Sequence, residues 1–315
     1  MSVILKITHT TRYRFARPVA LGEHRVMFRP RDSHDLRVLE TDLTVTPEPV
    51  DIRLIQDVFL NSVAIVEPQT PSQALEIVAS FKVEHTGTRA LDLPLDPSTQ
   101  YYPFAYDADE YIVLLPYITP YYLDPDGTLA AWAQQFAAAN TNEGDRVGIR
   151  DVLIAMTRHI RDTFRYEARF VEGVQTPYET LARNSGTCRD FATLMIEAVR
   201  QLGYAAKFVS GYLYSRMLDP ALDAAFDSAP DTHASGLGGD GAIGGGSTHA
   251  WLQVYLPGAG WLPFDPTNNL VGGNELVRVG FARHAAQASP VSGTWIGAPG
   301  DYLGMDVDVR VQRVN

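Results

Sequence analysis

Hydrophobic and polar residues alternate along several stretches near the start of the chain. The alternation runs from Leu5 to Phe15, from Leu36 to Thr46 and from Leu75 to Val83, with prolines and turn-forming residues between these stretches. A period of two residues is typical of a strand that buries one face. Residues 1–90 are therefore predicted to form an antiparallel β domain. His9 lies on the apolar face, where we expect a packed or hydrogen-bonded histidine rather than a ligand.

The rest of the chain has a mixed pattern. Residues 91–127 interleave prolines with tyrosines, which predicts a linker packed between two domains, although the tyrosines could instead line a substrate cleft. Residues 128–139 are rich in alanine, and apolar residues recur at helical steps from Ile149 to Phe164. Valines alternate with charged residues from Val307 to Val311, which predicts a closing strand. Residues 128–315 are thus expected to form an α+β core that includes this strand.

Glycine dominates one segment of the second half. Seven glycines and several aspartates lie between Leu218 and Ser247. A composition of this kind is typical of a mobile loop. Two interpretations stay open, namely a flap over the functional site and a surface insertion with no part in function.

Composition and charge narrow the class of protein. A chain of 315 residues exceeds a typical domain of roughly 100–200 residues, so two domains are expected. The formal charge of −11 repels phosphate backbones and anionic lipids, so neither nucleic acid nor a membrane is expected as a partner. The N-terminal residues lack the pattern of a signal peptide, and no apolar run approaches the roughly 18 residues of a membrane helix. We expect a soluble, cytoplasmic protein.

Cys188 is the single cysteine of the chain, which excludes an intramolecular disulfide and a zinc site built on paired thiolates. Apolar residues follow it at helical steps as far as Gly203, so Cys188 is predicted in the first turn of a helix, with Thr187 and Asp190 as a loose capping box. The positive end of a helix favours a thiolate, and its free N–H groups can bind an oxyanion. Taken alone, a lone cysteine is more often a small buried hydrophobe.

A predicted β-hairpin supplies possible partners for that thiol. His249 begins one strand and Asp265 ends the next, 16 positions later, so both lie at the same end of the hairpin. Neighbouring strands are about 4.8 Å apart, so the carboxylate can reach the ring and orient it. Asp265 alone would be interpreted as a turn residue before Pro266. Together with Cys188, the set provides a nucleophile, a base and an orienting group.

Several motifs around these residues resemble the bacterial transglutaminase-like superfamily of papain-type thiol enzymes. The resemblance rests on residues 186–192 around the cysteine, 248–251 around the histidine and 260–269 around the aspartate. Residues 202–213 are similar to the helix-to-strand connection of that family. The first strands and residues 57–61 resemble its N-terminal domain, so the resemblance covers nearly the whole chain.

The resemblance implies a fold and an activity. It implies an antiparallel β domain followed by a papain-like α+β catalytic core, with Cys188 as nucleophile, His249 as general base and acid, and Asp265 orienting His249. It also implies a thioester intermediate that water or an amine resolves. We therefore expect a cysteine-dependent amidase or peptidase acting on a peptide or protein substrate, and a transamidase or a non-catalytic scaffold stays open as an alternative. No cofactor and no metal are expected, because no Asp-x-Asp-x-Asp-Gly loop of the calcium-binding type is present.

Two stretches depart from the family pattern. Lys207 stands where such sequences usually carry arginine, and residues 283–287 lack the acidic and aromatic residues expected before Pro290. These departures leave Cys188, His249 and Asp265 in place. They change residues that the resemblance associates with the substrate pocket.

Overall fold

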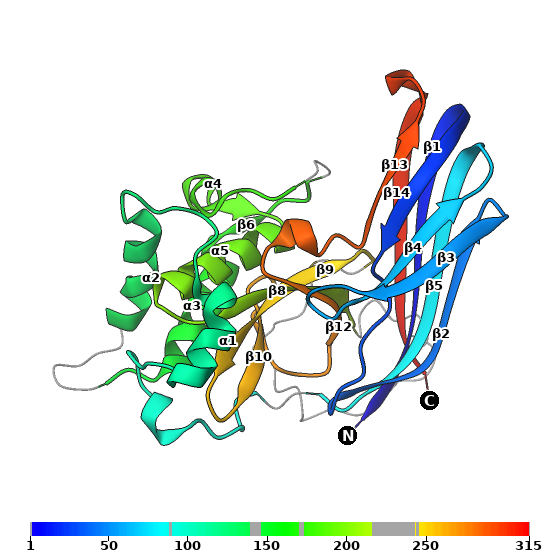
Figure 1. Ribbon diagram of the computed structural model, residues 1–315. Coiled ribbons are helices and arrows are strands. Elements are labelled where there is room, and N and C mark those ends of the chain that lie inside the picture. Colours follow the sequence, from blue (N-terminus) through cyan, green and yellow to red (C-terminus); the bar gives the residue numbers. More distant parts are fainter. Residues whose placement is uncertain are drawn as a thin grey trace, which may run out of the picture.

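The computed structural model describes residues 2–87, 90–138, 146–169, 173–215, 243 and 246–314. The predicted loop from Leu218 to Ser247 therefore lies outside the described residues except for Ile243, Gly246 and Ser247. Figure 1 shows a large sheet on one side of the molecule and a group of helices on the other, with a smaller sheet between them. This arrangement confirms the α+β prediction, with an antiparallel sheet at the N-terminus.

The large sheet is built around one long strand, β1 (Val3–Val26). Its first half pairs with β5 (Ser72–His85) and β14 (Tyr302–Val314), and its end pairs with β4 (Ser62–Pro68) and β13 (Val291–Ile296). The edges are β2 (Leu36–Thr46) and β3 (Val50–Gln56). The alternation that predicted the first strands also determines their burial, because Leu5 and Ile7 are fully buried and their polar neighbours are not.

The closing strand does not lie where we expected it. The alternating valines do form a strand, but β14 pairs with β1 from Ile4–Val314 to Phe15–Tyr302 and so completes the N-terminal sheet. The prediction that this strand belongs to the core formed by residues 128–315 is therefore wrong. A period of two residues predicts a strand and its buried face, but it does not say which sheet the strand joins.

The smaller sheet is antiparallel and is in contact with helices of this part of the chain. Its order is β11-β10-β9-β8-β12, with bounds Leu270–Val271, Gly260–Asp265, His249–Leu256, Ala206–Leu213 and Leu276–Ala282. The helices are α1 (Ala108–Ile118), α2 (Thr128–Ala138), α3 (Ile149–Thr163), α4 (Pro177–Arg183) and α5 (Cys188–Gln201). Two-residue strands β6 (Arg165–Tyr166) and β7 (Ser185–Gly186) pair in parallel. None of the described helices is long and apolar enough to cross a membrane.

Helix α5 is the centre of this second part. Nearly all of its residues are buried, and it packs against β9 and β8. Alternate residues of β9, such as Ala250 and Leu252, join Ala192 and Met195 of α5 in one hydrophobic cluster. Burial on all sides fixes the position of the helix and of the residue at its beginning.

A buried ion pair on α5 attaches the proline- and tyrosine-rich segment. Glu197 and Arg200 are almost completely buried and contact each other. The Glu197 carboxylate accepts hydrogen bonds from the backbone N–H groups of Tyr121 (2.8 Å) and Tyr122 (3.1 Å), and Arg200 donates to the carbonyl oxygen of Tyr117 (2.9 Å). The pair therefore satisfies backbone groups at the end of α1 and in the residues that follow it.

The two parts of the molecule meet through buried polar contacts. The Asn61 side chain donates to the carbonyl oxygen of Phe281 (2.7 Å) and accepts from its N–H (2.8 Å), as a neighbouring strand would. His9 hydrogen-bonds the Tyr212 hydroxyl (2.8 Å), and burial lowers the pKa of His9 to about 4. The prediction of a packed, hydrogen-bonded His9 is confirmed.

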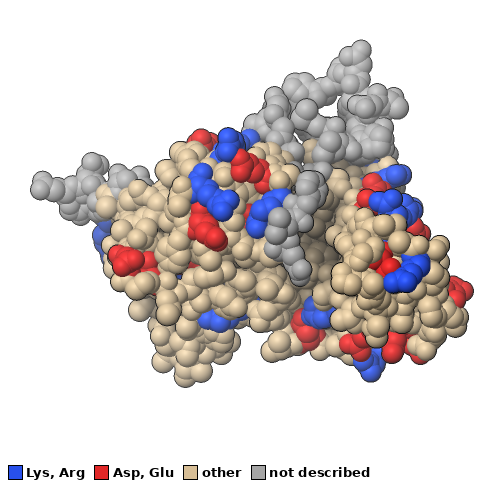
Figure 2. Space-filling view, turned by 90° about the horizontal axis from the view of Figure 1, so that it is seen from above, with Lys and Arg blue, Asp and Glu red and all other residues tan. Residues whose placement is uncertain are grey.

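Charge is spread over the outer surface. On the face shown in Figure 2, acidic and basic side chains are interspersed over both parts of the molecule. The surplus of acidic residues in the sequence therefore does not gather into one patch on this face.

Replacing Asn61 by alanine should destabilise the protein. The change leaves the N–H and the carbonyl oxygen of Phe281 without their side-chain partners, so the free energy of unfolding should fall by about 2–4 kcal/mol. Urea unfolding followed by circular dichroism measures this. Gln69→Ala, a change at an exposed side chain, serves as a control and should stay within about 0.5 kcal/mol of the wild type. An equal effect of both changes would contradict the role of Asn61.

Candidate active site

Cys188 is the first residue of α5 and is 7% exposed. Its own N–H and that of Arg189 belong to the first turn of the helix, where no carbonyl of the helix can accept them. The prediction that the cysteine begins a helix is confirmed. A negative charge on the sulfur is stabilised at this position by the helix dipole.

Asp190 fixes the turn that carries the cysteine. Its buried carboxylate accepts hydrogen bonds from the N–H (2.8 Å) and hydroxyl (2.9 Å) of Thr187, from the N–H of Gln175 (2.7 Å) and from the guanidinium of Arg169 (2.7 Å). We expected a loose capping box between Thr187 and Asp190. Thr187 and Asp190 do pair, with Asp190 as the acceptor of both contacts, and the same carboxylate holds the segment before α4 against the first turn of α5.

His249 and Asp265 lie at the same end of the hairpin, as their spacing predicted. His249 begins β9, Asp265 ends β10, and His249 Nε2 donates to Asp265 Oδ2 over 2.8 Å. Both side chains are fully buried. The other carboxylate oxygen accepts from the N–H groups of Thr267 (2.9 Å) and Asn268 (3.3 Å), so the turn that follows β10 holds the aspartate in place.

The electrostatics of this pair favour a charged imidazole. Burial lowers the pKa of His249, but the charge of Asp265, its hydrogen bond and the neighbouring Cys188 raise that pKa to about 10. Burial raises the pKa of Asp265, and the charge of His249 with the hydrogen bonds to the carboxylate outweighs this and leaves it lowered. The two shifts have the same cause, because each charged group stabilises the other in a site without solvent.

The second ring nitrogen of His249 is available to the cysteine. Nδ1 is buried and has no hydrogen-bond partner among the described residues, while Nε2 is taken by Asp265. Cys188 lies close enough for its side chain to raise the pKa of His249. The Trp251 ring stacks beside the imidazole, with 6.0 Å between ring centroids. The structure thus brings all three predicted residues together, with Nδ1 as the nitrogen that can exchange a proton with the sulfur.

Tyr166 is a further polar residue near Cys188 and Asp265, and the sequence did not predict it. It pairs with Gly186 in the short β6–β7 ladder, two residues before the cysteine. Its hydroxyl makes no hydrogen bond to any described residue. Burial raises the pKa of Tyr166 to about 12, and the charges of Cys188 and Asp265 add to this effect, so the hydroxyl keeps its proton at neutral pH. A two-residue strand has too short a pattern to be recognised in a sequence.

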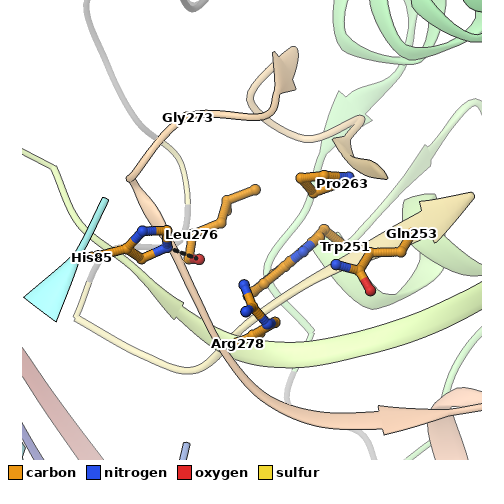
Figure 3. A pocket seen from close by; sticks show the side chains of 7 residues that line it. All are labelled: His85, Trp251, Gln253, Pro263, Gly273, Leu276 and Arg278. Carbon is orange, nitrogen blue, oxygen red and sulfur yellow. Dashed lines mark hydrogen bonds between the residues drawn. The ribbon is translucent and has the colours of Figure 1, made fainter. Parts of the chain in front are cut away.

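A small cavity at the joint between the two parts is lined by Trp251, which also contacts His249, but not by Cys188, His249 or Asp265. Figure 3 shows its lining, which comprises His85, Trp251, Gln253, Pro263, Gly273, Leu276 and Arg278. Its volume of about 10 Å³ is the space of roughly one water molecule, so it is too small for a substrate. Among the described residues, no three histidine, cysteine, aspartate or glutamate side chains gather in a group that could hold a metal ion.

The two departures from the family pattern make structural contacts. The Lys207 ammonium lies over the rings of Trp261 (3.9 Å) and Phe281 (4.5 Å), and burial lowers the pKa of Lys207 to about 7. His284, in the altered segment, stacks on Tyr121 at 4.1 Å and hydrogen-bonds the Tyr122 hydroxyl at 2.9 Å. Both residues thus pack against aromatic side chains.

Comparison with known proteins gives two family matches. Residues 5–84 match the bacterial transglutaminase-like N-terminal region, and residues 130–266 match the transglutaminase-like superfamily. The second match contains Cys188, His249 and Asp265.

Individual proteins are similar over nearly the whole chain. An uncharacterized protein of Mycobacterium tuberculosis is 28% identical over 314 residues, which cover 96% of this chain and 91% of the relative. One of Mycobacterium leprae is 23% identical over 313 residues, covering 98% and 99%. Among solved structures, a Cytophaga hutchinsonii protein that has been proposed to be a cysteine protease superimposes with a TM-score of 0.66 at 19% identity, covering 100% of this chain and 92% of that one. This likeness shows a shared fold.

The reactivity of the single cysteine tests the electrostatics of the site. At pH 6 we expect iodoacetamide to alkylate Cys188 in the native protein at least about 10-fold faster than in the urea-unfolded protein, because an ordinary thiol with a pKa of about 8.5 is almost entirely protonated there. Asp265→Asn removes the charge that raises the pKa of His249, so the imidazole loses its proton at a lower pH. The difference in alkylation rate between native and unfolded protein should therefore be smaller in this variant. Mass spectrometry of the modified protein gives the rates.

An exposed aspartate provides the matched control for this measurement. Asp96 lies in a turn that is distant from the site along the chain. In the Asp96→Asn variant, Cys188 should be alkylated at the wild-type rate. If native and unfolded protein react equally fast at pH 6, Cys188 is an ordinary thiol.

Proposed function

We propose that this chain, which belongs to the transglutaminase-like superfamily, is a cysteine-dependent hydrolase of amide bonds in peptides or proteins. One observation carries the proposal: a buried imidazole is hydrogen-bonded to a carboxylate through Nε2 and has its free Nδ1 beside a cysteine at a helix N-terminus. A nucleophile, a proton carrier and an orienting group are the minimum set for covalent acyl transfer.

The first half of the reaction forms a thioester. The Cys188 thiolate attacks the carbonyl carbon of the amide, a C–S bond forms, and the carbonyl oxygen takes the negative charge. His249, protonated because Asp265 raises its pKa, gives its Nδ1 proton to the departing nitrogen as the C–N bond breaks. An amine leaves, and the acyl group stays on the sulfur.

The negative oxygen needs hydrogen-bond donors within reach of the sulfur. The unpaired N–H of Cys188 is one, since the first turn of α5 offers no other acceptor for it. The Tyr166 hydroxyl is the second, because it has no described partner and keeps its proton at neutral pH. Both donors are part of the folded protein, so they need little reorganisation when charge develops.

The second half of the reaction hydrolyses the thioester and regenerates the free enzyme. Neutral His249 takes a proton from water through Nδ1, the resulting hydroxide attacks the thioester, and the C–S bond breaks to give a carboxylic acid and the cysteine. An amine in place of water would give a new amide, which is transamidation.

A substrate screen tests the reaction. Peptide and isopeptide libraries incubated with the protein should yield products with one added water, detected by mass spectrometry. Cys188→Ala should lower the rate by roughly 10³-fold or more, because the residue forms the covalent bond. The thioester itself should be trapped by rapid acid quenching of the wild type.

The same screen with an added primary amine distinguishes hydrolysis from transamidation. Products that carry the amine rather than water would overturn hydrolysis in favour of transamidation. Products that also form with Cys188→Ala would contradict the role of the cysteine.

Tyr166→Phe tests the second oxyanion donor. We expect kcat to fall by about 10²-fold with little change in KM, because the hydrogen bond to the oxyanion forms in the transition state. Steady-state kinetics on a substrate from the screen provides the measurement. Tyr111→Phe, at an exposed position of α1, should leave both parameters unchanged. A change in KM alone would assign Tyr166 to substrate binding instead.

A further inference from the structure

Asn268 is the one described side chain that contacts both the His249–Asp265 pair and Ile243. It is 6% exposed, and its Nδ2 donates to Asp265 Oδ2 over 2.9 Å, the oxygen that also accepts from His249. Nδ2 lies 3.4 Å from His249 Nε2. The amide is therefore in direct contact with the hydrogen bond that orients the imidazole.

The other contacts of Asn268 go to the backbone of Ile243. Oδ1 accepts from the Ile243 N–H over 2.7 Å, and Nδ2 donates to the Ile243 carbonyl oxygen over 3.2 Å. These two contacts determine which way round the amide lies. If the amide turned over, its oxygen would face the Asp265 carboxylate and its NH₂ group would face the Ile243 N–H, so both contacts would become repulsive.

We propose that Asn268 is a positioning residue for Asp265, and that the backbone of Ile243 sets its orientation. The inference rests on the function proposed above. Thr267 and Asn268 backbone N–H groups hold Oδ1 of the aspartate, and the Asn268 amide together with His249 holds Oδ2. Without the amide, Oδ2 has His249 as its remaining partner in the described structure, and the carboxylate loses one of the bonds that lower its pKa.

This role can be separated from a purely structural one by comparing two substitutions. Asn268→Ala removes the donor at every pH. Asn268→Asp replaces the amide by a carboxyl group, which can donate to Asp265 when protonated and repels Asp265 when ionised. Burial and the Asp265 charge should raise the pKa of the new carboxyl, while the His249 charge 3.4 Å away opposes this effect, so we expect the carboxyl to titrate between pH 5 and 8.

The alkylation rate of Cys188 between pH 5 and 8 provides a readout that needs no substrate. We expect Asn268→Ala to react about 10-fold more slowly than the wild type, because a misplaced carboxylate no longer orients His249. Asn268→Asp should approach the wild-type rate near pH 5 and fall to or below the Asn268→Ala rate by pH 8. The same pH dependence should appear in kcat once a substrate is known, with KM little changed.

Matched controls decide between the outcomes. Asn274→Ala, beyond the turn, should behave as the wild type, and urea unfolding should show each variant to be folded. If Asn268→Ala and Asn268→Asp differ from the wild type by the same factor at every pH, or not at all, the positioning role fails. If wild-type Cys188 itself reacts as an ordinary thiol, the proposed function fails instead.

Discussion

The buried pair of His249 and Asp265 is the interaction on which the arrangement of the second part of the chain depends. Two charges removed from water are stable when each has a close partner and further hydrogen bonds satisfy the remaining polar atoms. The hairpin supplies the pair, and the turn after β10 supplies donors to both carboxylate oxygens. Helix α5 then brings the sulfur to the one imidazole nitrogen that remains without a described partner.

Helix α5 serves this arrangement because it is anchored along its whole length. Asp190 joins its first turn to the segment before α4, and Glu197 with Arg200 joins its last turns to the segment around Tyr121. Apolar contacts with β8 and β9 occupy the faces between. A side chain at the start of such a helix moves little, and the proton transfer proposed above depends on this.

The sequence predicted the parts of the fold and of the site that depend on local patterns. Helix α5, the β9–β10 hairpin and the pairing of His249 with Asp265 follow from periodicity, glycine turns and spacing along neighbouring elements. The grouping of Cys188 with this pair was predicted from the chemistry of the three residues and from the family resemblance. Tyr166 and the amide of Asn268 were missed, because the first lies in a two-residue strand and the second acts through contacts with Ile243, 25 residues away. The partner of β14 was placed wrongly for a similar reason, since pairing over some 300 residues leaves no local signal.

The position of β14 has a consequence for how the protein is made. Because residues 302–314 pair with residues 4–15, β1 lacks one of its two neighbours along this stretch until residues 302–314 have left the ribosome. During synthesis the helical part can collapse first, while β1 exposes an open edge to other nascent chains. The large sheet therefore closes after the helical part has been synthesised, although β1 precedes that part in the chain.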